Sequence, residues 1–377
     1  MILKGGTVFC DDFVFRNIDV KTEGDGICAL GDFSDRRGQE VLDVSGSYVV
    51  PGLVDIHIHG AMGADFSAGT AAAIDTIARH LLQVGVTSFL GTTMALPGEQ
   101  LLAICDTARP LVNREIPGRA VLRGINLEGP FFSREKRGAQ NPAHIIPADF
   151  SLFSRLYQAS GENIRVLAIA PETEGAMELI REAAPLCTCS LAHTASDYDT
   201  AMRAFSRGAR HVTHLFNGMA AFTHREPGPV GAAFDAGAYV ELIADGVHIH
   251  PSVVRAVFRL FGAERVCLIS DAISACGMTD GAYALGGQTL TVRGPVSTIA
   301  NGSLAGSVTH LADCLRQAVS FGIPFADALR AATINPAESV GIAGQVGSLT
   351  VGKRADLLVL NPDYTHKQVI FGGVLQD

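Results

Sequence analysis

The 377-residue chain contains no tryptophan, no run of Lys or Arg, and no apolar stretch of the roughly 18 residues that a membrane span requires. Its first residues, MILKGGTVFCDDFVF, lack the apolar core and small-residue cleavage site of a signal peptide. With these absences and a formal charge of -9, we expect no nucleic-acid and no membrane partner. An anionic substrate stays compatible, because one phosphate needs only a local group of donors.

Cysteine is present, but its spacing gives no disulfide framework and no CxxC motif. The eight cysteines are scattered, and the closest pair is Cys187 and Cys189. Residues two apart share one face of a strand, so this pair is typical of small core residues. We therefore expect reduced thiols and a cytoplasmic location.

From about residue 48, short apolar runs alternate with stretches of helical periodicity. Each run is hydrophobic almost throughout, as a strand buried on both faces should be. The segment 70–85 shows the helical pattern, with apolar residues at i, i+3, i+4, i+7 and i+8 and a closing glycine. Eight such βα units predict an α/β fold, a (β/α)8 TIM barrel. The runs are YVVPGLVDIHIHG, TSFLGTTM, AVLRGINLEGP, IRVLAIAPE, CTCSLAHT, HVTHLFN, YVELIADG and VCLISDA.

The two ends of the chain have a different pattern, with short strand-like segments between Gly and Asp turns. We expect 1–48 and 343–377 to pair into one small β-sandwich domain, and 49–342 to form the barrel. Residues 281–303 are a third β-rich segment, which we expect to form hairpins inserted before the last helices.

Polar residues fall at the ends of most of the apolar runs, where a barrel collects its functional groups. The pair His57-x-His59 alone is a weak signal, since two such histidines can be an ordinary surface or core pair. Glu128 read alone could cap a helix or form a surface ion pair. Imidazoles and a carboxylate from four aligned strands together suit Zn²⁺ or Fe²⁺. The polar residues at the ends of six of the runs, in chain order, are His57, His59, Glu128, His193, His214, Asp245, His248 and Asp271.

Asp271 ends the eighth run and needs a separate role. A carboxylate beside a metal-activated water can accept its proton and return it to a leaving nitrogen. The alternative is an aspartate that caps the following helix.

Two loops are candidates for holding a substrate. Residues 216–229 follow the sixth run and contain Asn217, His224 and Arg225; arginine suits phosphate, although Arg225 could equally be an ordinary loop cation. Residues 302–307, GSLAGS, offer small side chains and exposed amides.

The chain resembles the N-acetylglucosamine-6-phosphate deacetylases of the amidohydrolase superfamily along nearly its whole length. Motifs such as PGLVDIHIHG and GKRADLLVLN are shared across the superfamily, and the combination of LEGP, HLFNGM, REPG and ADGVH is more specific. The resemblance implies a metal-dependent hydrolase that deacetylates N-acetylglucosamine 6-phosphate, acting in amino-sugar metabolism. It also implies a homodimer, because an arginine at the position of Arg225 reaches across the dimer interface in the family.

The resemblance also implies residue roles. Glu128, His193 and His214 would bind the main metal ion, with His57 and His59 adding a second, so that one or two divalent ions bind per subunit. Asp271 would be the catalytic acid and base, and His248 would bind substrate and support the carbonyl oxygen. The implied substrate contacts are Ala139, Gln140, Asn217, Gly218, Arg225, His248, Leu304, Ala305 and Gly306.

Some points stay open in the sequence. Gln140 stands where many family members have histidine, which puts the sugar contacts there in doubt. The C4 epimer N-acetylgalactosamine 6-phosphate is an alternative substrate, and a cyclic-amide or nucleobase hydrolase is another reading. No lysine stands where the carboxylated-lysine relatives have one, which counts against that second reading. A binding subunit without catalysis is a third alternative, but it would have no use for Asp271 and the metal ligands.

Overall fold

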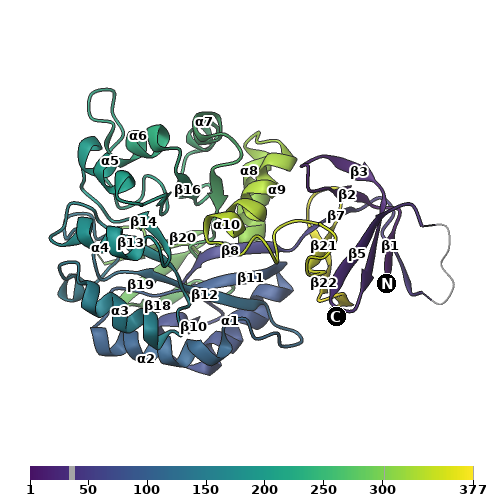
Figure 1. Ribbon diagram of the computed structural model, residues 1–377, viewed down its shortest axis with the longest axis horizontal. Helices are drawn as coiled ribbons and strands as arrows, with labels where there is room; N and C mark the ends of the chain where they lie inside the picture. The colour runs from purple at the N-terminus through teal and green to yellow at the C-terminus, as the bar shows by residue number, and fades with distance from the viewer. Residues whose placement is uncertain (34–38, 301, 377) are drawn as a thin grey trace.

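The computed structural model describes residues 1–33, 39–300 and 302–376. Its centre is an eight-stranded parallel sheet, hydrogen-bonded in chain order, and a parallel bridge between Ile58 and Ala272 joins its two ends. The predicted TIM barrel is therefore confirmed (Figure 1). The strands are β8 (Leu53–Ile58), β11 (Val86–Thr92), β12 (Val121–Glu128), β13 (Ile164–Ile169), β14 (Thr188–Leu191), β15 (His211–Val212), β16 (Tyr239–Leu242) and β17 (Val266–Leu268).

Amphipathic helices surround this sheet, and the first shows why. α1 (Ala71–Gln83) begins after Thr70, whose side chain accepts a hydrogen bond from the Ala73 amide. Its apolar stripe is buried, as the periodicity of 70–85 predicted. The others are α2 (Gly98–Ala108), α3 (Phe150–Ala159), α4 (Ala176–Ala183), α5 (Tyr198–Ser206), α6 (Gly228–Ala236), α7 (Pro251–Phe261), α8 (Leu311–Ser320), α9 (Phe325–Ala332) and α10 (Ile334–Ser339), with short 3-10 turns η1 (Phe66–Ala68), η2 (Arg109–Leu111) and η3 (Pro142–His144).

Both ends of the chain build a small β-sandwich beside the barrel (Figure 1). One sheet has the order β5-β4-β1-β6 and the other β23-β22-β21-β7-β2-β3. Apolar residues from both ends, among them Val8, Val49 and Leu357, share one buried cluster. The strands are β1 (Ile2–Lys4), β2 (Thr7–Phe9), β3 (Phe15–Asn17), β4 (Asp19–Glu23), β5 (Gly26–Gly31), β6 (Val41–Asp43), β7 (Tyr48–Pro51), β21 (Leu357–Leu360), β22 (His366–Phe371) and β23 (Val374–Leu375). The domain boundary at 48/49 stays a prediction, and β7, which crosses it, pairs with the terminal strands β2 and β21.

The β-rich segment 281–303 forms an antiparallel three-stranded sheet, except for residue 301, which lies outside the described residues. Ser297 in this sheet donates to the carbonyls of Ala305 and Gly306, and the Ala305 amide donates back to it. The sheet therefore fixes the GSLAGS segment next to the barrel mouth. Its strands are β18 (Gly281–Leu285), β19 (Gln288–Arg293) and β20 (Val296–Ile299), and a separate small ribbon is formed by β9 (Gly60–Ala61) and β10 (Ala64–Asp65).

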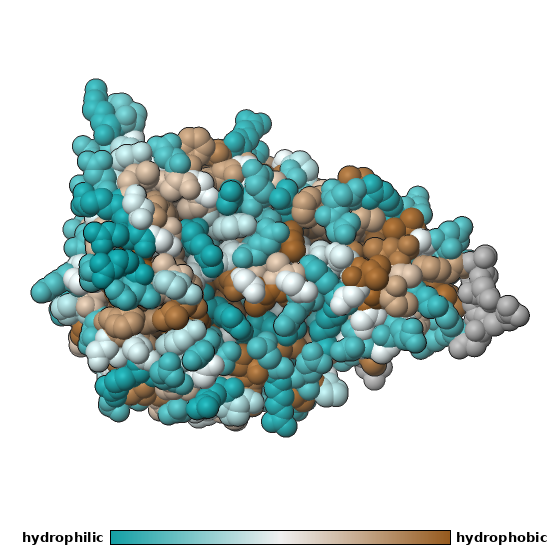
Figure 2. Space-filling model, in the orientation of Figure 1, coloured by the Kyte–Doolittle hydropathy of each residue, from teal (hydrophilic) through white to brown (hydrophobic). Residues whose placement is uncertain are grey.

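Within the described ranges, the helices are too short or too polar to cross a bilayer. On the face drawn in Figure 2, hydrophobic residues form scattered patches among hydrophilic ones. Cys187 and Cys189 are both buried, and the eight cysteines are all free.

Candidate active site

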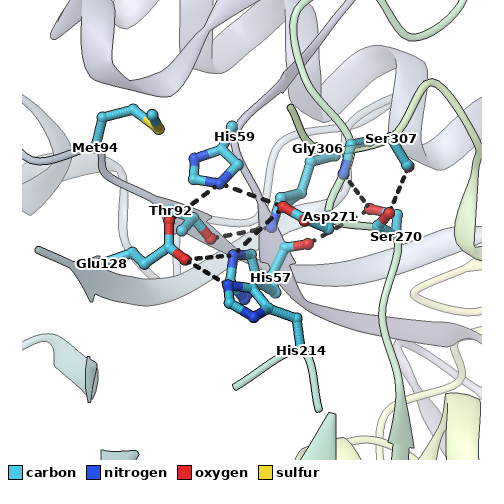
Figure 3. Close-up of polar contacts among 12 residues, drawn as sticks. His57, His59, Thr92, Met94, Glu128, His214, Ser270, Asp271, Gly306 and Ser307 are labelled. Atoms are coloured by element: carbon cyan, nitrogen blue, oxygen red, sulfur yellow. Dashed lines mark hydrogen bonds and ion pairs between the residues drawn. The ribbon is translucent and has the colours of Figure 1, made fainter. Parts of the chain in front are cut away.

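Glu128, the last residue of β12, lies within 3.6 Å of four imidazoles at the carboxyl end of the barrel, and Figure 3 labels three of them, His57, His59 and His214. Its Oε1 atom is 3.2 Å from Nε2 of His193 and 3.1 Å from Nε2 of His214. The predicted convergence of these three residues is thus observed, and all three are buried. Each imidazole is fixed through its other nitrogen: Nδ1 of His193 donates to the Lys136 carbonyl, and Nδ1 of His214 donates to the Asn217 carbonyl. This arrangement leaves the Nε2 lone pairs facing the carboxylate, as in metal sites.

His57 and His59 lie between Glu128 and Asp271 (Figure 3). His59 Nε2 is 3.3 Å from an oxygen of each carboxylate. His57 is held by Glu241, whose Oε2 accepts a 2.9 Å bond from Nδ1, and its Nε2 lies 3.6 Å from Glu128 and 3.5 Å from Asp271. Glu241 was not among the predicted site residues.

Positive charge between the carboxylates of Glu128 and Asp271 stabilises the cluster. Burial alone would raise the pKa of Glu128, but the neighbouring imidazoles, His57 foremost, hold it well below its ordinary value. Asp271 is similar: burial opposes and His59 favours a lowered pKa, and the lowering wins. Burial lowers the pKa of His57, yet Glu241 and Glu128 raise it to about 9. Protons or a cation can supply this charge.

A divalent metal fits this donor set. Among the described residues, His57 Nε2 and His59 Nδ1 are buried without a hydrogen-bond partner. A buried unpaired nitrogen is costly, and His57 Nε2 stands too far from the carboxylates for a good hydrogen bond but faces them both. Imidazole nitrogens and carboxylate oxygens are ligands that Zn²⁺ and Fe²⁺ accept.

The backbone is left-handed where the chain leaves three of the barrel strands. His193, His214 and Asp271 have φ values of 43°, 27° and 48°. Such conformations cost about 1–3 kcal/mol each in a non-glycine residue and persist where the surroundings enforce them. The Asp271 amide, for example, is held by a 3.0 Å bond to the His57 carbonyl.

Two glycines leave room for these residues. Gly218 has a φ of +60°, and a Cβ there would lie 2.8 Å from Nδ1 of His193. Gly306 also has a φ of +60°, and a Cβ there would lie 2.9 Å from the Asp271 carbonyl oxygen. Any larger residue at either position would therefore disturb the site.

A cavity of about 310 Å³ opens over the cluster. Most of the predicted site residues line it: His59, Glu128, Ala139, Gln140, His193, His214, Asn217, Gly218, His248, Asp271, Leu304 and Gly306. Five do not. His57, Asp245 and Ala305 are buried, and His224 and Arg225 are exposed outside the cavity. The lining also contains Met94, Gly138 and Leu285, which the sequence reasoning missed, and Ser303, which belongs to the predicted segment 302–307. Met94 ends the second apolar run and Leu285 lies in the hairpin segment.

Two polar side chains of the lining are held by neighbouring groups. His248 donates from Nδ1 to Asp245, at 2.7 Å, and its amide donates to the same carboxylate. Gln140 donates to Oε2 of Glu128, at 2.9 Å, and accepts from the Ala95 amide. In this chain Gln140 therefore helps to orient the central carboxylate.

Comparison with known proteins places this geometry in a family. Residues 48–375 match the model of the Amidohydrolase family. The N-acetylglucosamine-6-phosphate deacetylase of Bacillus subtilis is 37% identical over 86% of this chain and 83% of its own length. The N-acetylgalactosamine-6-phosphate deacetylase of Escherichia coli O157:H7 is 35% identical over 89% of both chains.

Among solved structures, a mutant N-acetyl-D-glucosamine-6-phosphate deacetylase from Mycobacterium smegmatis, in complex with N-acetyl-D-glucosamine-6-phosphate, is similar with a TM-score of 0.93 and 31% identity. The match covers 100% of this chain and 98% of that chain. The resemblance noted in the sequence motifs is confirmed. This chain belongs to the amidohydrolase family and, within it, to the N-acetylglucosamine-6-phosphate deacetylases.

Proposed function

We propose that this protein hydrolyses N-acetylglucosamine 6-phosphate to glucosamine 6-phosphate and acetate, in the amino-sugar metabolism of the cytoplasm. The observation that carries the proposal is the convergence of Glu128, His193 and His214 on one point, with Asp271 facing the same cavity. The relatives named for this reaction, and the one solved with this phosphosugar, support the choice of substrate.

The proposed cofactor is one or two divalent ions per subunit, Zn²⁺ or Fe²⁺. Glu128, His193 and His214 would hold the main ion, and His57 and His59 with Glu128 would hold a second. When bound, such an ion lowers the pKa of water towards about 7 and polarises a carbonyl oxygen.

Asp271 is the proposed acid and base. Its lowered pKa keeps it ionised at neutral pH, so it can accept a proton from the attacking water. It then delivers that proton to the sugar nitrogen as the amide bond breaks. The bond between the Asp271 amide and the His57 carbonyl keeps this carboxylate beside the imidazoles.

His248 is the proposed partner of the acetyl oxygen. Asp245 accepts the Nδ1 proton of His248, which fixes the orientation of the ring at the cavity. A proton on Nε2 would bond to the oxygen as negative charge develops, an interaction worth several kcal/mol in a dry site.

The sugar and its phosphate would lie along the remaining lining. Ala139, Gln140, Asn217, Gly218, Leu304, Ala305 and Gly306 are the proposed contacts on the same subunit. Arg225 is exposed and outside the cavity of its own chain, which is compatible with a role across the interface of a homodimer.

A second candidate is the same reaction on N-acetylgalactosamine 6-phosphate. The observation in its favour is the 35% identity to an enzyme named for that substrate. The two sugars differ only in the configuration at C4.

The test measures acetate release from both phosphosugars and from unphosphorylated N-acetylglucosamine, with and without a chelator. We expect the higher kcat/KM with N-acetylglucosamine 6-phosphate, loss of activity without phosphate, and loss with chelator. Loss of the phosphate should reduce kcat as well as affinity, because remote binding energy supports the chemical step.

Asp271→Asn should lower kcat by about 10²–10⁴-fold with metal content unchanged. Asp106→Asn, an exposed aspartate of α2, is the matched control and should leave kcat unchanged. An Asp271→Asn enzyme that turns over near the wild-type rate would remove the proposed role of this residue.

A further inference from the structure

A second group of soft metal ligands lies outside the active-site cavity. His80 comes from the last turn of α1, Cys276 follows the last barrel strand, and His310 is the residue before α8. One nitrogen from each histidine and the Cys276 sulfur all lie within 4.8 Å of one another. The two Nε2 atoms are 2.9 Å apart. None of the three residues lines the active-site cavity.

The orientation of His310 is the second observation. Its Nδ1 lies 3.1 Å from Oδ2 of Asp313, one turn into α8, and Arg316 in turn contacts Asp313. A carboxylate on one imidazole nitrogen fixes the ring so that the other nitrogen points at a ligand, a feature that recurs behind metal-bound histidines. In this chain the fixed nitrogen points at His80.

We propose that His80, Cys276 and His310 bind a zinc ion that is separate from the catalytic metal. A thiolate and two imidazoles are a donor set that selects zinc over magnesium or calcium. In a tetrahedral zinc site with these ligands, neighbouring ligand atoms lie roughly 3.3–3.6 Å apart, given Zn–N near 2.0–2.1 Å and Zn–S near 2.3 Å. The two Nε2 atoms, 2.9 Å apart, would separate by about 0.4 Å to reach the spacing of two nitrogen ligands.

The fourth ligand position of the proposed zinc ion is left to a water molecule or to the thioether of Met62. Gly277 has a φ of +80°, and a Cβ there would lie 2.6 Å from the Met62 sulfur and 3.3 Å from Cε1 of His80. The Met62 sulfur and the His80 imidazole therefore both lie beside Gly277, and the Met62 amide donates to the Cys276 carbonyl at 2.8 Å. Met62 is partly exposed, so solvent reaches this side of the cluster.

A zinc ion here would tie together three segments: α1, the segment 272–276 and the start of α8. The segment 272–276 begins directly after Asp271, and its first residue, Ala272, forms bridges with Ile58 and Ser307 and accepts a hydrogen bond from the His59 amide. The ion would thus have a structural role, because it would hold the segment 272–276, which directly follows Asp271, against α1 and α8.

Cobalt(II) is a suitable probe, because a thiolate ligand gives a charge-transfer absorption in the near ultraviolet. The described active site contains no cysteine, so this signal reports on the second site alone. Full-length protein is freed of metal with a chelator and titrated with Co²⁺. We expect the thiolate band in the wild type, its loss in Cys276→Ser, and one Co²⁺ fewer bound per chain in that variant. Cys28→Ser, a partly exposed free cysteine in β5, is the matched control and should keep the band.

His80→Asn should weaken Co²⁺ binding at this site by about tenfold or more, while leaving the binding to Glu128, His193 and His214 intact. Because His80 is only half-buried on the surface of a helix, this variant tests the site without depending on a core substitution. A wild-type protein without a thiolate band, or a band that survives in Cys276→Ser, would overturn the proposal. Either result concerns the second site only, since deacetylation is measured independently.

Discussion

Glu241 offers a test of how the barrel interior supports the metal site. This carboxylate of β16 is fully buried, and one of its oxygens accepts two bonds, from Nδ1 of His57 at 2.9 Å and from the His214 amide at 3.1 Å. Its other oxygen is buried without a hydrogen-bond partner among the described residues. Glu241→Gln can therefore keep both bonds with the amide oxygen while losing the charge, and its amide nitrogen is left unpaired.

The expected magnitude follows from the two bonds. A hydrogen bond to a charged acceptor contributes about 1.5–3 kcal/mol and one to a neutral acceptor about 0.5–1.5 kcal/mol. Weakening both costs roughly 1–3 kcal/mol, and each 1.4 kcal/mol is about a tenfold change in affinity. We therefore expect Glu241→Gln to lower metal affinity about 10–100-fold, measured by chelator competition, with most activity restored at high metal concentration.

The matched control is Glu338→Gln, an exposed carboxylate that accepts a bond from the hydroxyl of Tyr239 in the same strand β16. This substitution should leave metal affinity unchanged. If Glu241→Gln binds metal as tightly as the wild type while folding normally, then the charge behind His57 does not support the site, and the reasoning is wrong.

Three further outcomes test other contacts. Gly306→Ala should lower kcat by up to about 10²-fold without loss of metal, because its Cβ would push on the Ile273 side chain and the Asp271 carbonyl. The control Gly302→Ala is also at a positive φ, of +84°, but its Cβ would have open space around it. Arg225→Ala should raise KM for the phosphosugar, and mixing it with inactive Asp271→Asn should recover activity if hybrid dimers form one intact site; no recovery would place Arg225 outside the site. Thr70→Ala should lower the free energy of unfolding by about 1 kcal/mol in urea, through loss of the α1 cap, and should leave kcat unchanged.

The barrel strands and the metal-binding cluster could be predicted from the sequence, because a local residue pattern indicates each of them. Continuous apolar runs predicted the barrel strands, because both faces of a parallel strand are buried. Charged and imidazole groups at the ends of those runs predicted the cluster, because an unpaired polar group there is costly. Glu128, His193 and His214 converge for that reason.

Other features depended on contacts between distant segments. Glu241 lies within an apolar run, and its two partners come from other strands, so only the folded barrel shows its role. The one available signal was a carboxylate inside a buried strand, which demands a partner. Leu285 reaches the cavity because a hairpin folds over the mouth, and hairpin placement is not encoded by its strand pattern.

The left-handed backbone at His193, His214 and Asp271 explains how the fold directs these side chains to the site, which the strand pattern alone does not. In a regular strand, side chains alternate between the barrel interior and the helix layer, so one strand presents only every second residue to the interior. His193, His214 and Asp271 lie two or three residues beyond the last residues of β14, β15 and β17, and their positive φ values end this alternation. Each side chain can then turn across the barrel mouth towards the cluster. Each such residue costs about 1–3 kcal/mol, so the fold is less stable at three strand ends, where the three functional groups are directed at one point.

A glycine at His214 would relieve the backbone strain but remove the proposed metal ligand, whereas asparagine accepts the left-handed conformation readily. His214→Asn should therefore keep or increase stability while losing metal, and a strongly destabilised variant would show that the imidazole itself, rather than the backbone bonds around it, holds the turn.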